Sequence, residues 1–146
     1  MLRRNDRNLD NIPIGALGLI SLEGCEGMGE NENDDLVKWR RENGHIHKND
    51  GAFSGYERDT YLVNAGVPRF GSGEAKGIIK ESVRGMDLYL MVDVCNYSLT
   101  YSLTGHTNHM SPDDHHQNLK RITTAVVGTA RRPNLSLPLL SFITLQ

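Results

Sequence analysis

The stretch Asp87-Leu88-Tyr89-Leu90-Met91-Val92-Asp93-Val94 carries the strongest strand signal in this chain. Its apolar residues follow one another almost without interruption instead of alternating with polar ones. Such a run is typical of a strand that is buried on both faces, as in a parallel sheet covered by helices. We therefore expect a mostly parallel sheet with residues 88–92 at its centre.

The N-terminal part of the chain predicts one strand and one helix. Residues 12–22 are apolar and punctuated by glycine, which favours a buried strand. Residues 34–42 place apolar side chains at helical spacing, with Asn33 as the expected cap and Gly44 as the expected end. Residues 43–59 are polar and have no period, so we interpret them as a loop or an insertion.

The middle of the chain predicts a second strand and then a tight turn. Apolar side chains alternate along residues 60–67 in the manner of a strand, and Pro68 ends the pattern. Gly71-Ser72-Gly73 is typical of a turn. The later segment 96–110 is rich in Tyr, Ser, Thr and His and shows no clear period.

A second helix is predicted after Ser111-Pro112-Asp113-Asp114. Ser is a favoured cap, Pro is favoured at the first helical position, and acidic residues in the first turn complement the helix dipole. Residues 134–138 then predict a short strand. The predicted buried face of the helix consists of Leu119, Ile122, Ala125 and Val126.

This order of elements predicts an α/β domain with a mostly parallel sheet flanked by helices. The chain has 146 residues, which is the size of one domain. It carries 16 Lys and Arg against 18 Asp and Glu, without the clustered cations that nucleic acid requires. No apolar run approaches the roughly 18 residues of a membrane span, and the first residues do not resemble a secretory signal, so we expect a cytoplasmic protein. Cys25 and Cys95 lie far apart in sequence, which favours reduced thiols in the core.

Two groups of histidines are candidates for metal binding. The first consists of His106, His109, Asp113, Asp114, His115 and His116. Its spacing is poor for a metal site, since adjacent histidines diverge by about 100° around a helix. Its acidic residues are already explained as a helix start, so we favour a structural role for the group. The second, His45 with His47, lies in a hydrophilic segment that we interpret as a solvated loop.

Two further segments have chemistry that suits a nucleotide or a phosphate. The turn at residues 69–74 presents the Phe70 ring and the Glu74 carboxylate a few residues apart, and such a pair can stack on a planar base and accept from its amino group. The segment Ser82-Val83-Arg84-Gly85 offers a hydroxyl, a guanidinium and a flexible glycine beside a strand, which together suit a phosphate.

These two segments resemble the N-terminal domain of the ribose-phosphate pyrophosphokinase family. Arg69-Phe70 with Gly73-Glu74 is similar to the family's R-F-x-D-G-E turn, and Glu81-Ser82-Val83-Arg84-Gly85-x-Asp87 is similar to its E-S-V-R-G-x-D. Specific resemblance covers residues 69–138, and residues 17–43 fit by the order of elements. The resemblance implies a phosphoribosyltransferase-like fold. It also implies a reaction in which ATP, with magnesium, donates its β,γ-diphosphoryl group to the 1-hydroxyl of ribose 5-phosphate, for nucleotide synthesis.

The resemblance also implies roles for individual residues. Phe70 and Glu74 would contact the adenine of ATP across a subunit boundary, so a homo-oligomer is implied. Ser72 stands where the family has Asp, and its hydroxyl would still form a hydrogen bond without a charge. Ser82 and Arg84 would bind a regulatory phosphate.

Several parts of the family's machinery have no counterpart in this sequence. The nucleotide-holding Arg-Gln pair is replaced by residues around 141–146, and the magnesium-binding histidine, the basic catalytic loop and the acidic ribose 5-phosphate loop are absent. We accordingly assign no catalytic residue and no metal ligand. We expect an N-terminal fragment whose apolar segment 135–145 packs against a missing domain or a second copy. The alternative is a noncatalytic regulatory or interaction domain of the same fold.

Overall fold

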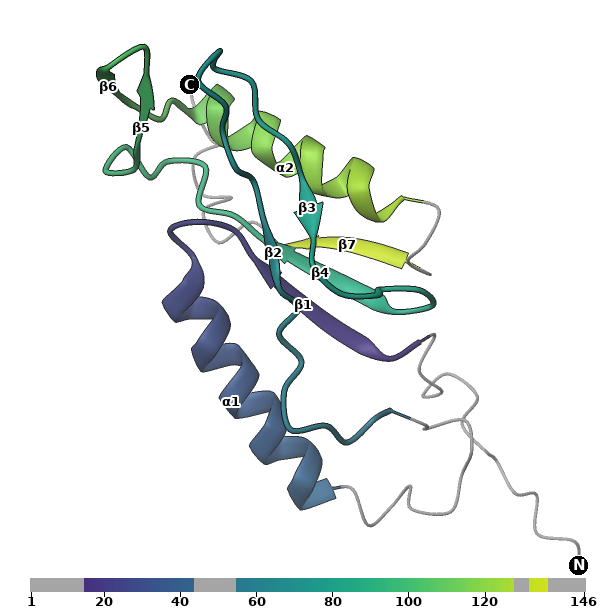
Figure 1. Ribbon diagram of the computed structural model, residues 1–146. Helices are drawn as coiled ribbons and strands as arrows, with labels where there is room; N and C mark the ends of the chain where they lie inside the picture. The colour runs from purple at the N-terminus through teal and green to yellow at the C-terminus, as the bar shows by residue number, and fades with distance from the viewer. Residues whose placement is uncertain (1–14, 44–54, 128–131, 137–146) are drawn as a thin grey trace, which may run out of the picture.

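The structure is a computed structural model that describes residues 15–43, 55–127 and 132–136. It is a mixed α/β fold with a small parallel sheet and two helices (Figure 1). Predictions that concern His45, His47, the cap at Gly44 and the apolar segment 137–145 lie outside the described residues. The elements are β1 (Leu17–Ser21), α1 (Glu26–Asn43), β2 (Ala65–Gly66), β3 (Ile78–Ile79), β4 (Asp87–Met91), β5 (Thr100–Leu103), β6 (His106–His109), α2 (Pro112–Val126) and β7 (Arg132–Ser136).

The main sheet contains three parallel strands in the order β1-β4-β7, so the prediction of a central strand at residues 88–92 is confirmed. Leu19 also bridges Leu62 in parallel. The amide of Leu19 donates to the carbonyl of Tyr61, and the amide of Val63 donates to the carbonyl of Leu19. Residues 61–63 therefore extend the sheet on the outer side of β1.

The two helices cover opposite faces of this sheet (Figure 1). The chain passes from β1 through α1 to residues 61–63 on one side, and from β4 through α2 to β7 on the other. Right-handed crossovers that move in opposite directions place their helices on opposite faces. The core on the α2 face consists of Ile20, Leu22, Val63, Val83, Met86, Leu88, Leu90, Val92, Leu119, Ile122 and Val126. The core on the α1 face consists of Leu19, Cys25, Tyr61 and Met91.

The expectation that β4 is buried on both faces is correct for the α2 face and for only part of the other face. Leu88 and Leu90 are buried on the α2 face, whereas Tyr89 on the other face is 37% exposed. Met91, further along that face, is buried together with Leu19. The cover provided by α1 thus reaches the carboxyl end of β4 but leaves Tyr89 open to solvent.

The predicted bounds of the first helix are wrong at its start. The helix begins at Glu26, eight residues before the expected position at residue 34. Asn33 is therefore not a cap. It is buried inside α1, where its side-chain oxygen accepts from the Tyr61 amide at 2.8 Å and from the Thr60 hydroxyl at 3.1 Å. A polar residue that we assigned to a helix end instead ties the helix to the edge of the sheet.

The predicted strand at residues 60–67 is divided between two partners. Residues 61–63 lie beside β1, and only the two residues of β2 pair with β3 in an antiparallel ribbon. The ribbon leaves the sheet and runs alongside α2 (Figure 1). The first strand is likewise shorter than predicted, since β1 covers residues 17–21 of the expected 12–22. Residues 12–14 lie outside the described part of the chain.

The hairpin of β5 and β6 lies in a segment for which no regular structure was expected. Its two-residue turn consists of Thr104 and Gly105, which have φ angles of 50° and 83°. Two successive positive φ angles give the turn the twist that antiparallel strands favour, and glycine adopts such an angle without strain. The Thr-Gly pair is the local signal that indicates this hairpin.

The second helix is confirmed from Pro112. Ser111 caps it, and Asp114 completes a capping box by accepting from the Ser111 amide. Three of the four residues predicted on its buried face are buried, but Ala125 is exposed and His115 is buried in addition. The last strand, predicted at residues 134–138, is β7.

The two cysteines are free thiols in different surroundings. Cys25 is buried as predicted, whereas Cys95 is exposed, so its assignment to the core is wrong. Cys95 follows the central strand in a loop, and its amide donates to the side chain of Asp93. Within the described residues, neither helix is both long and apolar enough to cross a membrane.

Candidate functional site

The tip of the β2–β3 ribbon is a tight, hydrogen-bonded turn. The amide of Gly73 donates to the carbonyl of Phe70 at 2.9 Å, and the amide of Phe70 donates to the carbonyl of Glu74 at 2.7 Å. Arg69 and Ala75 form an antiparallel bridge just before the turn closes. Phe70 and Glu74 therefore lie opposite each other on the two arms of the ribbon, on the same face.

Arg69 anchors this turn to the body of the protein. Its guanidinium donates to the carbonyl of Gly73 at 3.0 Å, lies 4.0 Å from the centre of the Tyr101 ring and forms an ion pair with Asp114 at 3.4 Å. The Arg69 side chain is only 14% exposed, so these contacts are shielded from water. Arg69 thus connects the ribbon tip to β5 and to the first turn of α2.

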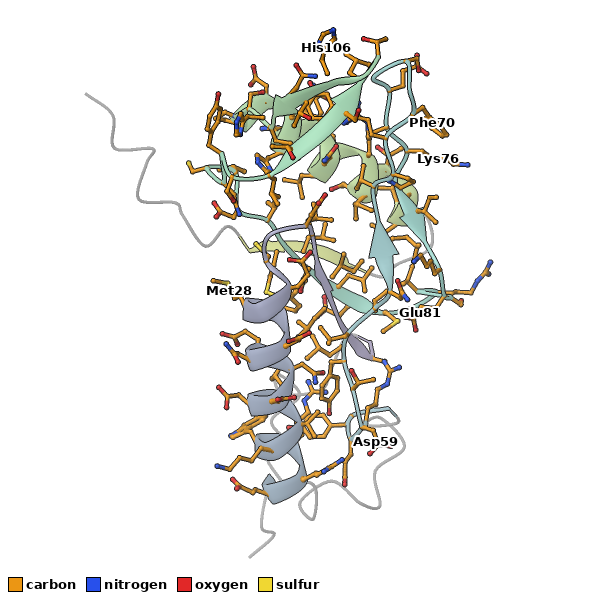
Figure 2. All side chains as sticks on the ribbon, turned by 60° about the vertical axis from the view of Figure 1, so that its left-hand side comes forward. Met28, Asp59, Phe70, Lys76, Glu81 and His106 are labelled. Carbon is orange, nitrogen blue, oxygen red and sulfur yellow. The ribbon has the colours of Figure 1, made fainter. Side chains whose placement is uncertain are left out.

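The three residues predicted to contact ATP all lie on this turn and are exposed. The Phe70 side chain is 52% exposed at the edge of the molecule (Figure 2), although a phenyl ring of this kind is more often buried. Ser72 and Glu74 are exposed as well. A fixed turn with an open ring and a nearby carboxylate can stack on a planar base and accept a hydrogen bond from it.

The residues predicted to bind a regulatory phosphate lie elsewhere. Ser82 and Arg84 are exposed in the loop that precedes β4, at the amino end of that strand. Glu81 in the same loop accepts from the Asn64 amide at 2.7 Å, and Figure 2 shows Glu81 and Phe70 at opposite ends of the ribbon. The structure therefore brings Phe70, Ser72 and Glu74 together but does not bring Ser82 and Arg84 to them.

A cavity of about 240 Å³ lies at the carboxyl ends of β1 and β4, on the α2 face. The chain leaves these neighbouring strands in opposite directions, towards residues 61–63 and towards β7. Ligands of open α/β sheets bind where two such strands diverge, because the diverging connections leave a crevice there. The cavity is lined by Ser21, Leu22, Glu23, Glu26, Ala65, Gly66, Val67, Val92, Met110, His115 and Asn118.

His115 is the most deeply buried polar residue of this cavity. It is 2% exposed, and its Nε2 lies 2.9 Å from the carbonyl of Asn96. A neutral imidazole with Nε2 protonated would donate to that carbonyl and keep Nδ1 as an acceptor. Sequence reasoning missed this site because its residues come from segments that meet only in the folded sheet. Leu22 and Glu23 directly follow β1 and Val92 directly follows β4, and this position is the signal that indicates the site.

Three residues of the group considered for metal binding, His109, Asp114 and His115, have structural partners. Burial works against the charged form of Asp114, but the hydrogen bonds from the Ser111 amide and hydroxyl, together with the Arg69 charge, hold its pKa below the ordinary value. The ring of His109 stacks on Tyr97 at 4.6 Å. In the described part of the chain, no group of three His, Cys, Asp or Glu residues could hold a metal ion. The described members of this group do not form a magnesium site.

Comparison of the chain with protein-family models, with curated proteins and with solved structures finds no significant match.

Proposed function

We propose that this chain belongs to the ribose-phosphate diphosphokinases, has their phosphoribosyltransferase-like fold and supplies a contact to ATP. In that reaction the 1-hydroxyl oxygen of ribose 5-phosphate attacks the β-phosphorus of ATP, AMP leaves, and the hydroxyl proton passes to solvent. The role assigned to this chain is the adenine contact made by Phe70 and Glu74, not the chemical step. A cytoplasmic homo-oligomer, in which the turn of one copy meets the nucleotide of another, belongs to the same proposal.

The exposed Phe70 on a rigid turn is the observation that carries the proposal. An exposed ring contributes little to folding, whereas a ring held by a fixed backbone loses little conformational freedom when a base stacks on it. Arg69, Tyr101 and Asp114 hold the turn in place, and Glu74 lies beside the ring as an acceptor. Adenine offers an amino group to such an acceptor, whereas guanine offers a carbonyl oxygen at the corresponding position.

Calorimetric titration of ATP and GTP into the full chain tests the nucleotide contact. Phe70→Ala should weaken ATP binding about tenfold, since a base stacked on an aromatic side chain contributes roughly 1–3 kcal/mol. Phe70→Trp should bind ATP about as tightly as the native chain does. Glu74→Gln should reduce the preference for ATP over GTP.

Tyr97→Ala provides a matched control, because Tyr97 is another exposed aromatic residue, in the loop before β5. It should leave ATP binding unchanged. Equal binding of ATP by the native chain and by Phe70→Ala would contradict the proposed contact. Light scattering should also show an oligomer that Phe70→Ala weakens, and a monomer at all concentrations would contradict contact between copies.

The cavity at the ends of β1 and β4 favours a second candidate, a noncatalytic regulatory domain of the same fold. Its inner wall is apolar at Leu22, Val92 and Met110, and its mouth carries the exposed carboxylates of Glu23 and Glu26. Neither Lys nor Arg is among the described residues that line it. Such a site suits a neutral, hydroxyl-bearing molecule and disfavours a phosphorylated one.

Ribose and ribose 5-phosphate distinguish the two candidates. A regulatory domain predicts that ribose raises the melting temperature of the chain more than ribose 5-phosphate does, and that Glu23→Gln narrows the difference. The diphosphokinase proposal predicts AMP release from ATP, magnesium and ribose 5-phosphate when this chain is joined to a family segment that carries the catalytic loop and the ribose 5-phosphate loop. Abolition of that release by Glu74→Ala would favour the diphosphokinase over the regulatory domain.

A further inference from the structure

A shallow groove of about 380 Å³ separates the β2–β3 ribbon from the second half of α2. It is distinct from the cavity at the strand ends, and it shares no lining residue with that cavity. It borders the Phe70 turn, since Ala75 pairs with Arg69, but residues 70–74 are not among its described lining residues. The groove is lined by Ala75, Lys76, Gly77, Lys120, Arg121, Thr124 and Ala125.

Close packing of the ribbon on the helix forms the floor of this groove. A Cβ atom at Gly77 would lie 2.5 Å from the carbonyl oxygen of Arg121, so only glycine permits this approach. The Arg121 guanidinium donates to the side-chain oxygen of Asn118, one turn earlier in α2, at 2.9 Å. This bond fixes the direction of one cation beside the groove and lowers the entropic cost of binding an anion there.

Three cationic residues line the groove, and none of the described residues that line it is acidic. Lys76 extends outward from the ribbon (Figure 2), while Lys120 and Arg121 come from the facing turn of α2. The chain as a whole has a net charge of -2, so this positive site is local. Arg and Lys are the residues that bind phosphate oxygens, Arg through its planar fork of N–H donors and Lys as a point charge.

We infer that this groove binds a compact phosphoanhydride, that is, the di- or triphosphate group of a small molecule or the free inorganic ion. Three cations on the two sides of one groove match the several negative charges of such a group. A nucleic acid requires a longer row of cations along its backbone, and the described residues that line the groove include three. The inference does not depend on the proposed function, because it requires neither Phe70 nor Glu74.

Titration of inorganic tripolyphosphate into the full chain at low ionic strength tests the groove. The double variant Lys76→Gln, Lys120→Gln should weaken binding at least about tenfold, since hydrogen bonds to charged groups contribute roughly 1.5–3 kcal/mol each. The matched control is the double variant Lys38→Gln, Lys80→Gln, which removes the same charge at exposed lysines outside the groove. The control should bind nearly as tightly as the native chain.

Further binding measurements identify the source of the anion and distinguish this groove from the proposed adenine contact. Phe70→Ala should not alter tripolyphosphate binding, whatever it does to ATP. In the Phe70→Ala chain, ATP that binds more tightly than tripolyphosphate would identify a nucleotide as the source, and equal binding would identify the free ion. The inference would be overturned if the groove variant and the control variant lost the same amount of tripolyphosphate affinity. It would also be overturned if the native chain bound a tetraglutamate peptide as tightly as tripolyphosphate, or did not bind tripolyphosphate at millimolar concentration.

Discussion

The two faces of the sheet are held by different interactions. On the α2 face, eleven buried residues from the sheet, the loops beside it and the helix form one apolar core. On the α1 face, four buried residues form a smaller core. There the helix is also tied by polar side chains, since Asn33 accepts from Thr60 and Tyr61, and Arg40 donates to the Tyr56 carbonyl at 2.8 Å.

Aromatic rings add to the polar contacts on the α1 face. The Arg40 guanidinium lies 4.2 Å from the centre of the Tyr56 ring and 4.8 Å from that of Tyr61. The apolar face gains its stability from burial, which is not directional, whereas the polar face depends on a few bonds of defined geometry. We therefore expect the α2 face to respond to lost volume and the α1 face to respond to lost hydrogen bonds.

The largest effect is expected from Ile122→Ala, which removes a fully buried side chain from the α2 face. Lost burial and the resulting cavity should lower the free energy of unfolding by about 3 kcal/mol in urea denaturation. Leu36→Ala, at a half-buried position on α1, should cost about half as much. Equal costs at the two positions would show that the faces do not differ in apolar packing.

Asn33→Ala should have the next largest effect. It leaves the buried Tyr61 amide without its acceptor, which should cost about 2 kcal/mol. Urea denaturation measures the loss, and hydrogen exchange at the Tyr61 amide should become faster. Glu32→Ala, at the exposed neighbouring position, should stay within about 0.5 kcal/mol of the native chain. A neutral effect of Asn33→Ala would show that the α1 face does not depend on this bond.

Acid should weaken the start of α2 through Asp114. Because the pKa of this carboxyl lies below its ordinary value in the folded state, its contribution is present above the unfolded pKa of about 3.9 and is lost as the pH falls through the folded value. Asp114→Asn should therefore cost about 1 kcal/mol near pH 6 and less near pH 2. The matched variant Asp113→Asn, at an exposed position of the same turn, should cost less than Asp114→Asn near pH 6.

The smallest expected effect concerns thiol reactivity. A thiol reagent should modify the exposed Cys95 quickly and the buried Cys25 slowly. Burial, with the nearby charge of Asp93, raises the pKa of the Cys25 thiol and so lowers its reactive thiolate fraction. In a Cys95→Ser background, Asn33→Ala should accelerate labelling of Cys25, because both residues belong to the α1 face. Labelling of both thiols at one rate would contradict the burial of Cys25.

Much of the fold was predictable where the signal is local. The central strand and the capped start of α2 were predicted from consecutive residues, because continuous burial and capping chemistry depend on neighbours in sequence. The turn that groups Phe70, Ser72 and Glu74 was predicted for the same reason. The early start of α1 was not, since Gly27, Gly29 and several polar residues lower helix propensity there, and contact with β1 overrides it.

The sequence by itself determined the central strand, the capped start of α2 and the composition of the ribbon tip. Only the tertiary structure decided which distant residues meet: Asn33 with Tyr61, Arg69 with Tyr101 and Asp114, and the two sides of the cationic groove. The physical reason is that a periodic pattern records only whether a side chain is buried. The choice of partner depends on the free energy of contacts between segments far apart in the chain, which no local stretch of residues contains.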